Sequence, residues 1–293
     1  MTKKTHNMLF AYLMMAPFLF FFFMFVTLPG LLSIGLSVTY YNMLETPRWV
    51  GAENFVTLLL ADDVFLISLR NTLVFAMITG PIGYILSFLF AWLINELNRY
   101  LRAIMTVVYY GPTLAGNLFF MWLYIFSGDA YGLANSTLMR FGIIRDPIIW
   151  LLDVRYNSII TMIVMIWMSM GVGFLAFLAG MQTLNKSLSE AGALDGIRNR
   201  WQELFYITIP QLGPMLMFGA VMAIAGSFAV GHIPATLTGF PSTDYSTHTL
   251  TLHMQDVGFT RFEMGYAGAI AVFLYAMLIF VRKIINKLLG RYM

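Results

Sequence analysis

Between Glu190 and Pro210, this largely apolar chain carries a polar stretch, EAGALDGIRNRWQELFYITIP, that separates two long apolar runs. Its charged residues are two glutamates, one aspartate and two arginines, and Gly196 divides it into two helical patterns. A connection that only reverses the chain needs a handful of residues, as 95–102 does elsewhere. The length and the helix–glycine–helix pattern of residues 190–210 therefore predict a surface on which another protein docks.

The sequence offers no pattern for catalysis or for a cofactor of its own. It has no cysteine, which excludes disulfides, thiolate metal sites and cysteine nucleophiles. No G-x-x-x-x-G-K-[ST] motif is present, so the chain has no P-loop for ATP. His248, His253 and Asp256 fit no common metal signature, and we expect them to be exposed loop residues. The chain is therefore not expected to be an enzyme.

Composition places the chain in a bilayer. Of its 293 residues 59% are apolar and 11% are charged, with a mean hydropathy of +0.77, whereas soluble domains carry about 25% charged residues. A span needs about 20 apolar residues, and six segments qualify, each without Asp, Glu, Lys or Arg. These are residues 8–28 (an uncleaved helix), 71–94, 103–126, 158–180, 213–232 and 265–281. We therefore predict an all-α membrane protein with six transmembrane helices.

The basic residues predict how these spans are oriented. One set of alternate loops, with both termini, holds eleven Lys and Arg residues, and the other set holds six. Because cytoplasmic loops carry the excess of Lys and Arg, both termini and residues 181–212 are expected to be cytoplasmic. The eleven are Lys3, Lys4, Arg99, Arg102, Lys186, Arg198, Arg200, Arg282, Lys283, Lys287 and Arg291. Cations spread along membrane edges in this way give no indication of nucleic-acid binding.

Proline and glycine mark special points in the spans. The prolines kink or end helices, either as ordinary bundle kinks or as hinges for transport, and the glycines are small enough to let helices approach closely. The prolines are Pro17, Pro81, Pro112 and Pro214, and the glycines are Gly171, Gly173, Gly219, Gly226, Gly265 and Gly268.

Local signals also subdivide the polar stretch. Ser187 and Glu190 have the spacing of a capping box, which would satisfy free amides at a helix start. A second helix with Trp201 on its apolar face is expected after Gly196, and Pro210 is expected to stop it.

The stretch resembles the EAA-type cytoplasmic loop of binding-protein-dependent ABC importer permeases. The resemblance is to the carbohydrate type, related to the larger permease of the maltose system. Two further elements are similar to that family: WVGxENF at residues 49–55 and FxxGYAGAIAV at residues 262–272. The matching loop residues are Glu190, Ala191, Asp195, Gly196, Trp201, Ile207, Thr208, Ile209 and Pro210.

The resemblance implies a type I ABC importer permease fold, with residues 1–293 forming one permease domain and residues 181–212 a cytoplasmic coupling loop. It implies an assembly in the bacterial or archaeal cytoplasmic membrane, surrounded by lipid. The partners would be a second homologous permease, two ATPase subunits that hold ATP and Mg, and an extracytoplasmic solute-binding protein. The ATPase would contact Glu190, Ala191, Gly192, Asp195, Gly196 and Pro210, with Glu190 near a basic residue of the ATPase.

Two departures from the family pattern have structural consequences. Gly192 stands where the family usually has alanine, and we expect it to loosen the short helix because Gly costs about 1 kcal/mol relative to Ala. One extra residue also lies between Gly196 and Pro210. In a continuous α-helix the extra residue would rotate all later residues of the helix by about 100°, unless a bulge absorbs it.

The spans also bear on the solute. An ion-coupled secondary transporter usually has ionisable residues inside the membrane, and these spans have none. An uncharged pathway suits a neutral, hydroxyl-rich solute such as a sugar; the alternatives are ion-coupled transport or a permease for a non-carbohydrate solute. Aromatic and hydroxyl side chains are candidates for contacting a sugar, although aromatic residues also form interfacial belts. The candidates are Asn117, Trp122, Tyr124, Trp167, Ser169 and Ser227.

Three loops of about thirty residues are expected outside: 42–70, 127–157 and 233–264. They either hold a partner protein or cap the bundle. Asn135-Ser136-Thr137 matches a glycosylation sequon, and residues 245–257 have the spacing of a short surface helix.

Overall fold

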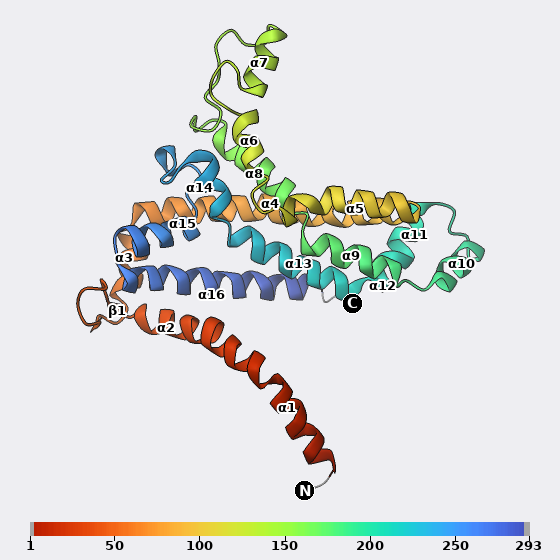
Figure 1. Ribbon diagram of the computed structural model, residues 1–293, viewed down its shortest axis with the longest axis horizontal. Coiled ribbons are helices and arrows are strands. Elements are labelled where there is room, and N and C mark those ends of the chain that lie inside the picture. Colours follow the sequence, from red (N-terminus) through yellow and green to blue (C-terminus); the bar gives the residue numbers. More distant parts are fainter. Residues whose placement is uncertain (1–2, 290–293) are drawn as a thin grey trace. The chain divides into compact units, whose positions relative to one another are not determined.

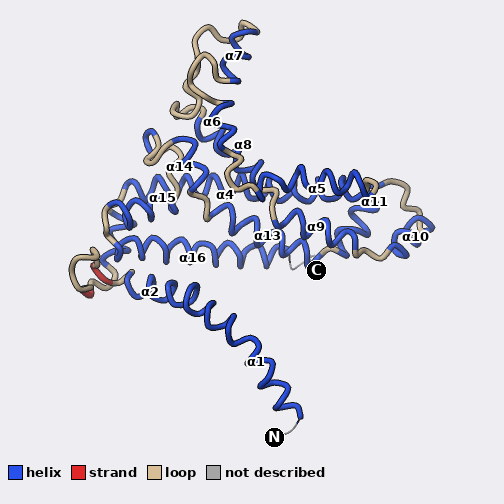
Figure 2. Tube along the Cα trace, in the orientation of Figure 1, coloured by secondary structure: helices blue, strands red, loops and turns tan. Residues whose placement is uncertain are grey.

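The computed structural model describes residues 3–289, and the side chains of residues 12–185 and 187–287, as a predominantly helical chain (Figures 1 and 2). Arg291 lies outside the described residues. The chain divides into two compact units, Met1–Asp63 with Met254–Tyr275, and Val64–His253 with Ala276–Met293.

The first unit begins with a long apolar helix. It comprises α1 (Lys3–Phe22), a π-helical turn (Phe23–Thr27) and α2 (Leu28–Leu36). Within the described span of 25 residues from Tyr12 to Leu36, the most apolar stretch has none of its residues buried by the rest of the chain. Burial of these side chains must therefore come from lipid or from another subunit.

A short hairpin, one helix and the part of a second helix up to Tyr275 complete the first unit. Strand β1 (Thr39–Tyr40) pairs antiparallel with β2 (Arg48–Trp49), and α3 (Glu53–Leu60) follows. After a π-helical turn (Asp256–Thr260), α16 (Met264–Leu289) begins.

The WVGxENF element has a structural role in this unit. The amide of Asn54 donates to the backbone oxygens of Ser37 (2.8 Å) and Thr39 (2.9 Å), which ties α3 to the end of α2 and to β1. On α16, a side chain at Gly265 would overlap the Thr39 carbonyl, and one at Gly268 would lie 2.9 Å from the Ser33 oxygen. The expected role of these two glycines in close approach is confirmed.

The second unit contains the remaining helices. They are α4 (Asp63–Asn95), α5 (Arg99–Leu114), α6 (Phe120–Ile125), α7 (Leu133–Arg140), α8 (Asn157–Met168), α9 (Val172–Gln182), α10 (Lys186–Leu194), α11 (Arg200–Glu203), a π-helical turn (Leu204–Thr208), α12 (Ile209–Gln211), α13 (Gly213–Phe228), α14 (His232–Thr238), a 3-10 turn (Thr243–Tyr245) and α15 (Leu250–Gln255).

The pairing of α9 with α13 forms the centre of this unit. Gly173 faces Gly219 across the pair, so the two backbones approach closely. The fully buried ring of Phe177 packs on Gly219 and meets Tyr84 and Phe88 of α4 edge-on, at 5.5 Å in each case. The close-approach role predicted for the glycines holds at Gly219, but nothing lies within 4 Å of a methyl group at Gly226.

The described helices agree with four of the six expected spans, and with a fifth only if a bent pair of helices counts as one span. Four helical stretches of the described chain are long and apolar enough to cross a membrane: Tyr12–Leu36, Asp63–Asn95, Asn157–Gln182 and Met264–Lys287. A fifth is formed if Arg200–Gln211 and Gly213–Phe228, which meet at 83°, count as one span. The expected span 103–126 is instead divided between α5 and α6.

The break in residues 103–126 has a local cause. Pro112 lies near the end of α5, and Gly116 takes a positive φ of 59° that no α-helix contains. The sequence pattern showed an unbroken apolar run because apolarity persists through the non-helical residues 115–119.

The prediction that His248 and His253 are exposed is wrong. Both are buried, with exposed fractions of 1% and 0%. His248 stacks on Phe240 and meets Tyr245 edge-on. His253, on α15, meets His248 edge-on and packs against Phe65. Among the described residues, no group of three or more His, Cys, Asp or Glu side chains is placed to hold a metal ion.

Gly219→Ala should destabilise the second unit. The added methyl group would lie 2.7 Å from Cε1 of Phe177, whose ring is held by Tyr84 and Phe88. Overpacking of this kind costs about 1–3 kcal/mol, so the thermal unfolding midpoint in detergent should fall. Gly226→Ala on the same helix is the matched control, because its methyl group meets open space. Equal midpoints for the two variants would contradict the packing described here.

Candidate functional site

The polar stretch begins at a helix whose cap differs from the predicted one. The N-cap of α10 is Asn185, whose side-chain oxygen accepts from the backbone N–H (3.1 Å) and the hydroxyl (2.8 Å) of Ser187. Ser187 therefore lies inside the helix, and the predicted capping box with Glu190 does not form. Glu190 is exposed. Its carboxylate has no hydrogen bond or ion pair with any side chain that the structure describes; the side chain of Lys186 is not among those described.

The reversal after α10 depends on glycine. Asp195 closes the helix through its N–H to the Ala191 oxygen (3.0 Å), and Gly196 then takes a φ of +98°. Residues with a side chain rarely adopt that conformation. The expected break at Asp195-Gly196 is confirmed.

A reciprocal cap starts the second helix. Asn199 accepts from the N–H of Gln202 (2.8 Å), and the Gln202 side chain accepts from the N–H of Arg198 (2.8 Å). Helix α11 therefore begins at Arg200, later than the apolar pattern suggested. Asn199 and Gln202 thus form a reciprocal cap of the kind that was predicted for Ser187 and Glu190.

The start of α11 is attached to the end of α4. Arg200 forms an ion pair with Glu96 (2.8 Å) and a second one with Glu203 (3.2 Å). The ring of Trp201 lies 5.1 Å from that of Trp92. The polar stretch is thus held against a membrane-spanning helix by one charged contact and one aromatic contact.

The glycine at position 192 makes room for two isoleucines. A methyl group there would lie 2.5 Å from Cδ1 of Ile207 and 2.9 Å from Cδ1 of Ile197. The departure from the family's alanine therefore lets the turn after Gly196 and the segment before α12 close onto α10.

The extra residue before Pro210 does not rotate a continuous helix. Residues 195–199 are non-helical, and Leu204–Thr208 form a π-helical turn, which is a bulge of the kind that absorbs an inserted residue. Pro210 does not stop the helix either, because α12 continues to Gln211. The chain turns at Leu212, where the 83° bend to α13 begins.

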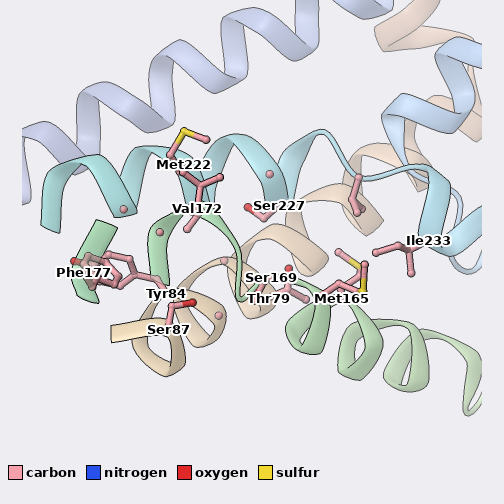
Figure 3. Close-up of a pocket in the computed structure, with 18 residues that line it drawn as sticks. Thr79, Tyr84, Ser87, Met165, Ser169, Val172, Phe177, Met222, Ser227 and Ile233 are labelled. Carbon is pink, nitrogen blue, oxygen red and sulfur yellow. The ribbon is translucent and has the colours of Figure 1, made fainter. Parts of the chain in front are cut away.

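The second candidate site is a cavity of about 230 Å³ between α4, α8, α9 and α13 (Figure 3). None of its eighteen lining residues is charged. Two of the six candidate pathway residues, Ser169 and Ser227, lie in it. Three residues of α4 with hydroxyl groups, which sequence reasoning did not select, line it as well: Thr79, Tyr84 and Ser87.

Glycines of α4 set the width of this cavity. A methyl group at Gly83 would overlap the hydroxyl of Ser169 and lie 2.9 Å from its Cβ, and one at Gly80 would lie 3.1 Å from the Ser227 hydroxyl. A signal for the missed residues was present: the small and hydroxyl residues of α4 recur at helical spacing on its buried face. They are Thr72, Ala76, Thr79, Gly80, Gly83, Ser87 and Ala91.

The cavity adjoins an interruption of the fourth span. Residues 169–171 separate α8 from α9, which frees backbone carbonyls inside the membrane region. The hydroxyl of Thr113 donates to the oxygens of Met170 (3.1 Å) and Met168 (3.4 Å). Irregular backbone at this depth is tolerated where such partners exist.

The other four candidates do not line the cavity. Asn117 is exposed between α5 and α6, and Tyr124 is exposed on α6. Trp122 and Trp167 meet edge-to-face at 5.6 Å, and Trp122 packs against the core around Phe119.

Comparison with known proteins assigns the class. Residues 80–293 match the family described as binding-protein-dependent transport system inner membrane component, and the chain belongs to this family. It is therefore a multi-pass membrane component of a transport system, as the resemblance implied.

Particular relatives cover most of the chain. The lactose transport system permease protein LacF of Rhizobium radiobacter is 28% identical over 264 residues, which are 89% of this chain and 87% of LacF. The sn-glycerol-3-phosphate transport system permease protein UgpA of Agrobacterium fabrum is 30% identical over 239 residues, 79% and 78% of the two chains.

A solved structure confirms the fold. A chain in the crystal structure of a bacterial alginate ABC transporter, in complex with an alginate pentasaccharide-bound periplasmic protein, superposes with a TM-score of 0.80 at 22% identity. The alignment covers 99% of this chain and 96% of that one.

Gly192→Ala should loosen the polar stretch, and Ile207→Val should rescue it. The alanine methyl group would lie 2.5 Å from Cδ1 of Ile207 and 2.9 Å from Cδ1 of Ile197, and valine at position 207 lacks the atom that makes the closer contact. The double variant should therefore restore transport that the single variant reduces, measured as solute uptake at equal amounts of inserted protein. Additive losses in the double variant would show that Gly192 and Ile207 do not determine each other's packing.

Proposed function

We propose that this chain is the permease subunit through which an ATP-powered importer moves a neutral sugar or oligosaccharide into the cell. The uncharged cavity carries this proposal: five side chains with hydroxyl groups line it, and none of its lining residues is charged. They are Thr79, Tyr84, Ser87, Ser169 and Ser227. A hydroxyl group both donates and accepts hydrogen bonds, as the hydroxyls of a sugar do. The lactose permease among the relatives supports the same class of solute.

The serines are oriented to receive such a solute. Ser169 donates to the Ile166 oxygen (2.7 Å), and Ser227 donates to the Ile224 oxygen (3.0 Å). With their protons engaged in their own helices, both oxygens retain lone pairs that accept from a sugar hydroxyl. An anionic solute, in contrast, would lose hydration in this cavity without gaining a counter-charge.

The polar stretch is proposed as the contact to a separate ATPase that holds ATP and Mg. The chain has no P-loop, and Glu190 projects from α10 without taking part in a cap. Because Asn185 caps α10 instead, Glu190 has no capping role there, which favours a contact between Glu190 and a partner protein. Ala191, Gly192, Asp195, Gly196 and Pro210 would shape the same surface.

The topology and assembly belong to this proposal. Both termini and residues 181–212 would lie in the cytoplasm of a bacterial or archaeal cell, because the basic residues favour that side. A second homologous permease and two ATPase subunits would complete the importer. A solute-binding protein would deliver the sugar from outside, in keeping with the description of the family.

Glu190→Ala and Gly196→Asp should uncouple ATP hydrolysis from uptake. The first removes an exposed carboxylate, and the second places a side chain at a φ of +98°, which costs about 1–3 kcal/mol. Uptake per ATP hydrolysed by the reconstituted importer should fall while membrane insertion is unchanged. Glu45→Ala, which removes an exposed glutamate on another loop, is the control. Normal uptake in both variants would refute the coupling role.

Ser169→Ala and Ser227→Ala should each slow uptake of a neutral oligosaccharide. Loss of one hydrogen bond of about 1 kcal/mol corresponds to roughly a fivefold effect, measured as the maximal rate with saturating loaded binding protein. Ser136→Ala, outside the cavity, should have no effect. A wild-type importer that prefers glycerol 3-phosphate or a uronate over neutral sugars would overturn the assignment of solute class.

A further inference from the structure

The loop between α6 and α8, residues 126–156, is built around one buried side chain. Asn135 is fully buried, and its amide donates to the backbone oxygens of Ser127 (3.2 Å), Asp129 (3.0 Å) and Ile148 (3.0 Å). Its oxygen accepts from the N–H of Ile148 (3.1 Å) and the indole N–H of Trp150 (2.8 Å). Both ends of the loop are therefore tied to α7, and the sequon at Asn135 is a structural element with no accessible amide.

A second set of bonds fixes the entry to α7. Asp129 accepts from the N–H groups of Tyr131 (2.8 Å) and Gly132 (2.7 Å) and from the Ser127 hydroxyl (2.6 Å). These bonds, that of Ser127 first, hold the pKa of the Asp129 carboxyl below its usual range. Gly132 is required here, because a methyl group would lie 2.5 Å from the Ser127 oxygen.

The exit from α7 is closed by a Schellman motif. The N–H of Ile143 donates to the Leu138 oxygen (3.0 Å), and that of Gly142 donates to the Met139 oxygen (2.9 Å). Gly142 has the positive φ, 67°, that this motif needs. These two bonds define the backbone path from the end of α7 to Ile143.

The loop held by these hydrogen bonds has apolar and basic side chains exposed at the end of α7. Phe141 and Ile143 are 74% and 67% exposed, and Arg140 and Arg145 beside them lie at the surface too. Figure 1 shows α7 and its flanking loops beyond α6 and α8, in the yellow-green part of the chain. We call residues 140–145 the α7 tip.

We propose that the α7 tip is a docking point for the extracytoplasmic solute-binding protein, which would offer an apolar recess bordered by acidic residues. Rigid aromatic and arginine side chains are the usual anchors of protein interfaces, and the basic pair sets the complementary charge of the partner. A loop that only connected two helices would not need a fully buried hydrogen-bonding centre, a braced turn before α7 and a Schellman motif after it. This inference rests on the proposed function and on the outward placement of residues 127–157.

The test uses the complete importer in proteoliposomes and the solute-binding protein that supports sugar uptake by the wild type. Phe141→Asp and Ile143→Asp should each raise the half-saturating concentration of loaded binding protein about tenfold or more, as expected for an interface anchor. The maximal uptake rate and the basal ATPase rate should stay unchanged, since the tip is remote from the cavity residues. Arg145→Glu should act in the same direction, and Arg145→Lys should not.

Leu44→Asp is the matched control, because Leu44 is 91% exposed on a different outer loop. An unchanged half-saturating concentration for the tip variants would overturn the docking point while leaving the importer function intact. If no solute-binding protein supports uptake by the wild type, the proposed function and this inference both fail.

A second measurement separates protein docking from lipid contact. The chain has no cysteine, so Ile143→Cys introduces a single thiol. After alkylation with a thiol-reactive, photoactivatable reagent and illumination, this position should cross-link to the purified binding protein, whereas Leu44→Cys treated in the same way should not. Quenching of a label at position 143 by membrane-embedded quenchers, without any cross-link, would show that the tip lies in lipid and would overturn the proposal.

Discussion

Close approach at glycine is the interaction on which both candidate sites depend. At Gly219 the absent side chain admits the ring of Phe177, and this brings α9 against α13 and α4. At Gly83 it admits the hydroxyl of Ser169 to the cavity wall, and at Gly192 it admits the isoleucines that close the polar stretch. In a membrane, where helix association has little hydrophobic driving force, such contacts supply the packing energy and also fix the geometry.

The need to satisfy backbone groups explains where the helices break. The interruption at residues 169–171 is tolerated because Thr113 donates to carbonyls of Met168 and Met170. It lies beside the cavity, where Ser169 needs a backbone that leaves the helical path. By contrast, α4 continues as one helix through Pro81. Proline alone therefore does not determine which span is interrupted, and the carbonyls freed at residues 169–171 are accommodated by the Thr113 hydroxyl.

Sequence reasoning predicted the features that depend on local chemistry or on total apolarity. The membrane class, the family, the break at Gly196 and the close approaches at Gly219 and Gly265 could be predicted from residue type and spacing. The prediction from sequence was wrong where two neighbouring residues were both suited to the same capping position. Ser187 and Asn185 are both good N-caps, and only the path of the preceding chain makes Asn185 the cap.

Features built from distant residues were beyond reach. Four of the six pathway candidates lie outside the cavity. Aromatic character alone does not tell whether a ring faces a pathway or another side chain, and the rings of Trp122 and Trp167 face each other. The burial of His248 likewise depends on Phe240 and Tyr245, whose positions no local pattern gives. The buried face of α4 was readable from its small residues, but its hydroxyl groups became candidates only once α9 and α13 were in place.

Helix α4 joins the two sites physically. Its last turn and the residue after it provide Trp92 and Glu96 to the polar stretch, and its middle provides Gly83 to the cavity, about 20 Å away at 1.5 Å per residue. The ion pair is largely exposed and contributes about 0–1 kcal/mol, and the ring contact adds about 0.5–1.5 kcal/mol. Attachments this weak hold the polar stretch in place without locking it, so a partner whose binding favours another position by a few kcal/mol is able to shift it. Because α4 is one helix from Asp63 to Asn95, the same element carries the attachment of the polar stretch and the wall that Gly80 and Gly83 present to Ser227 and Ser169.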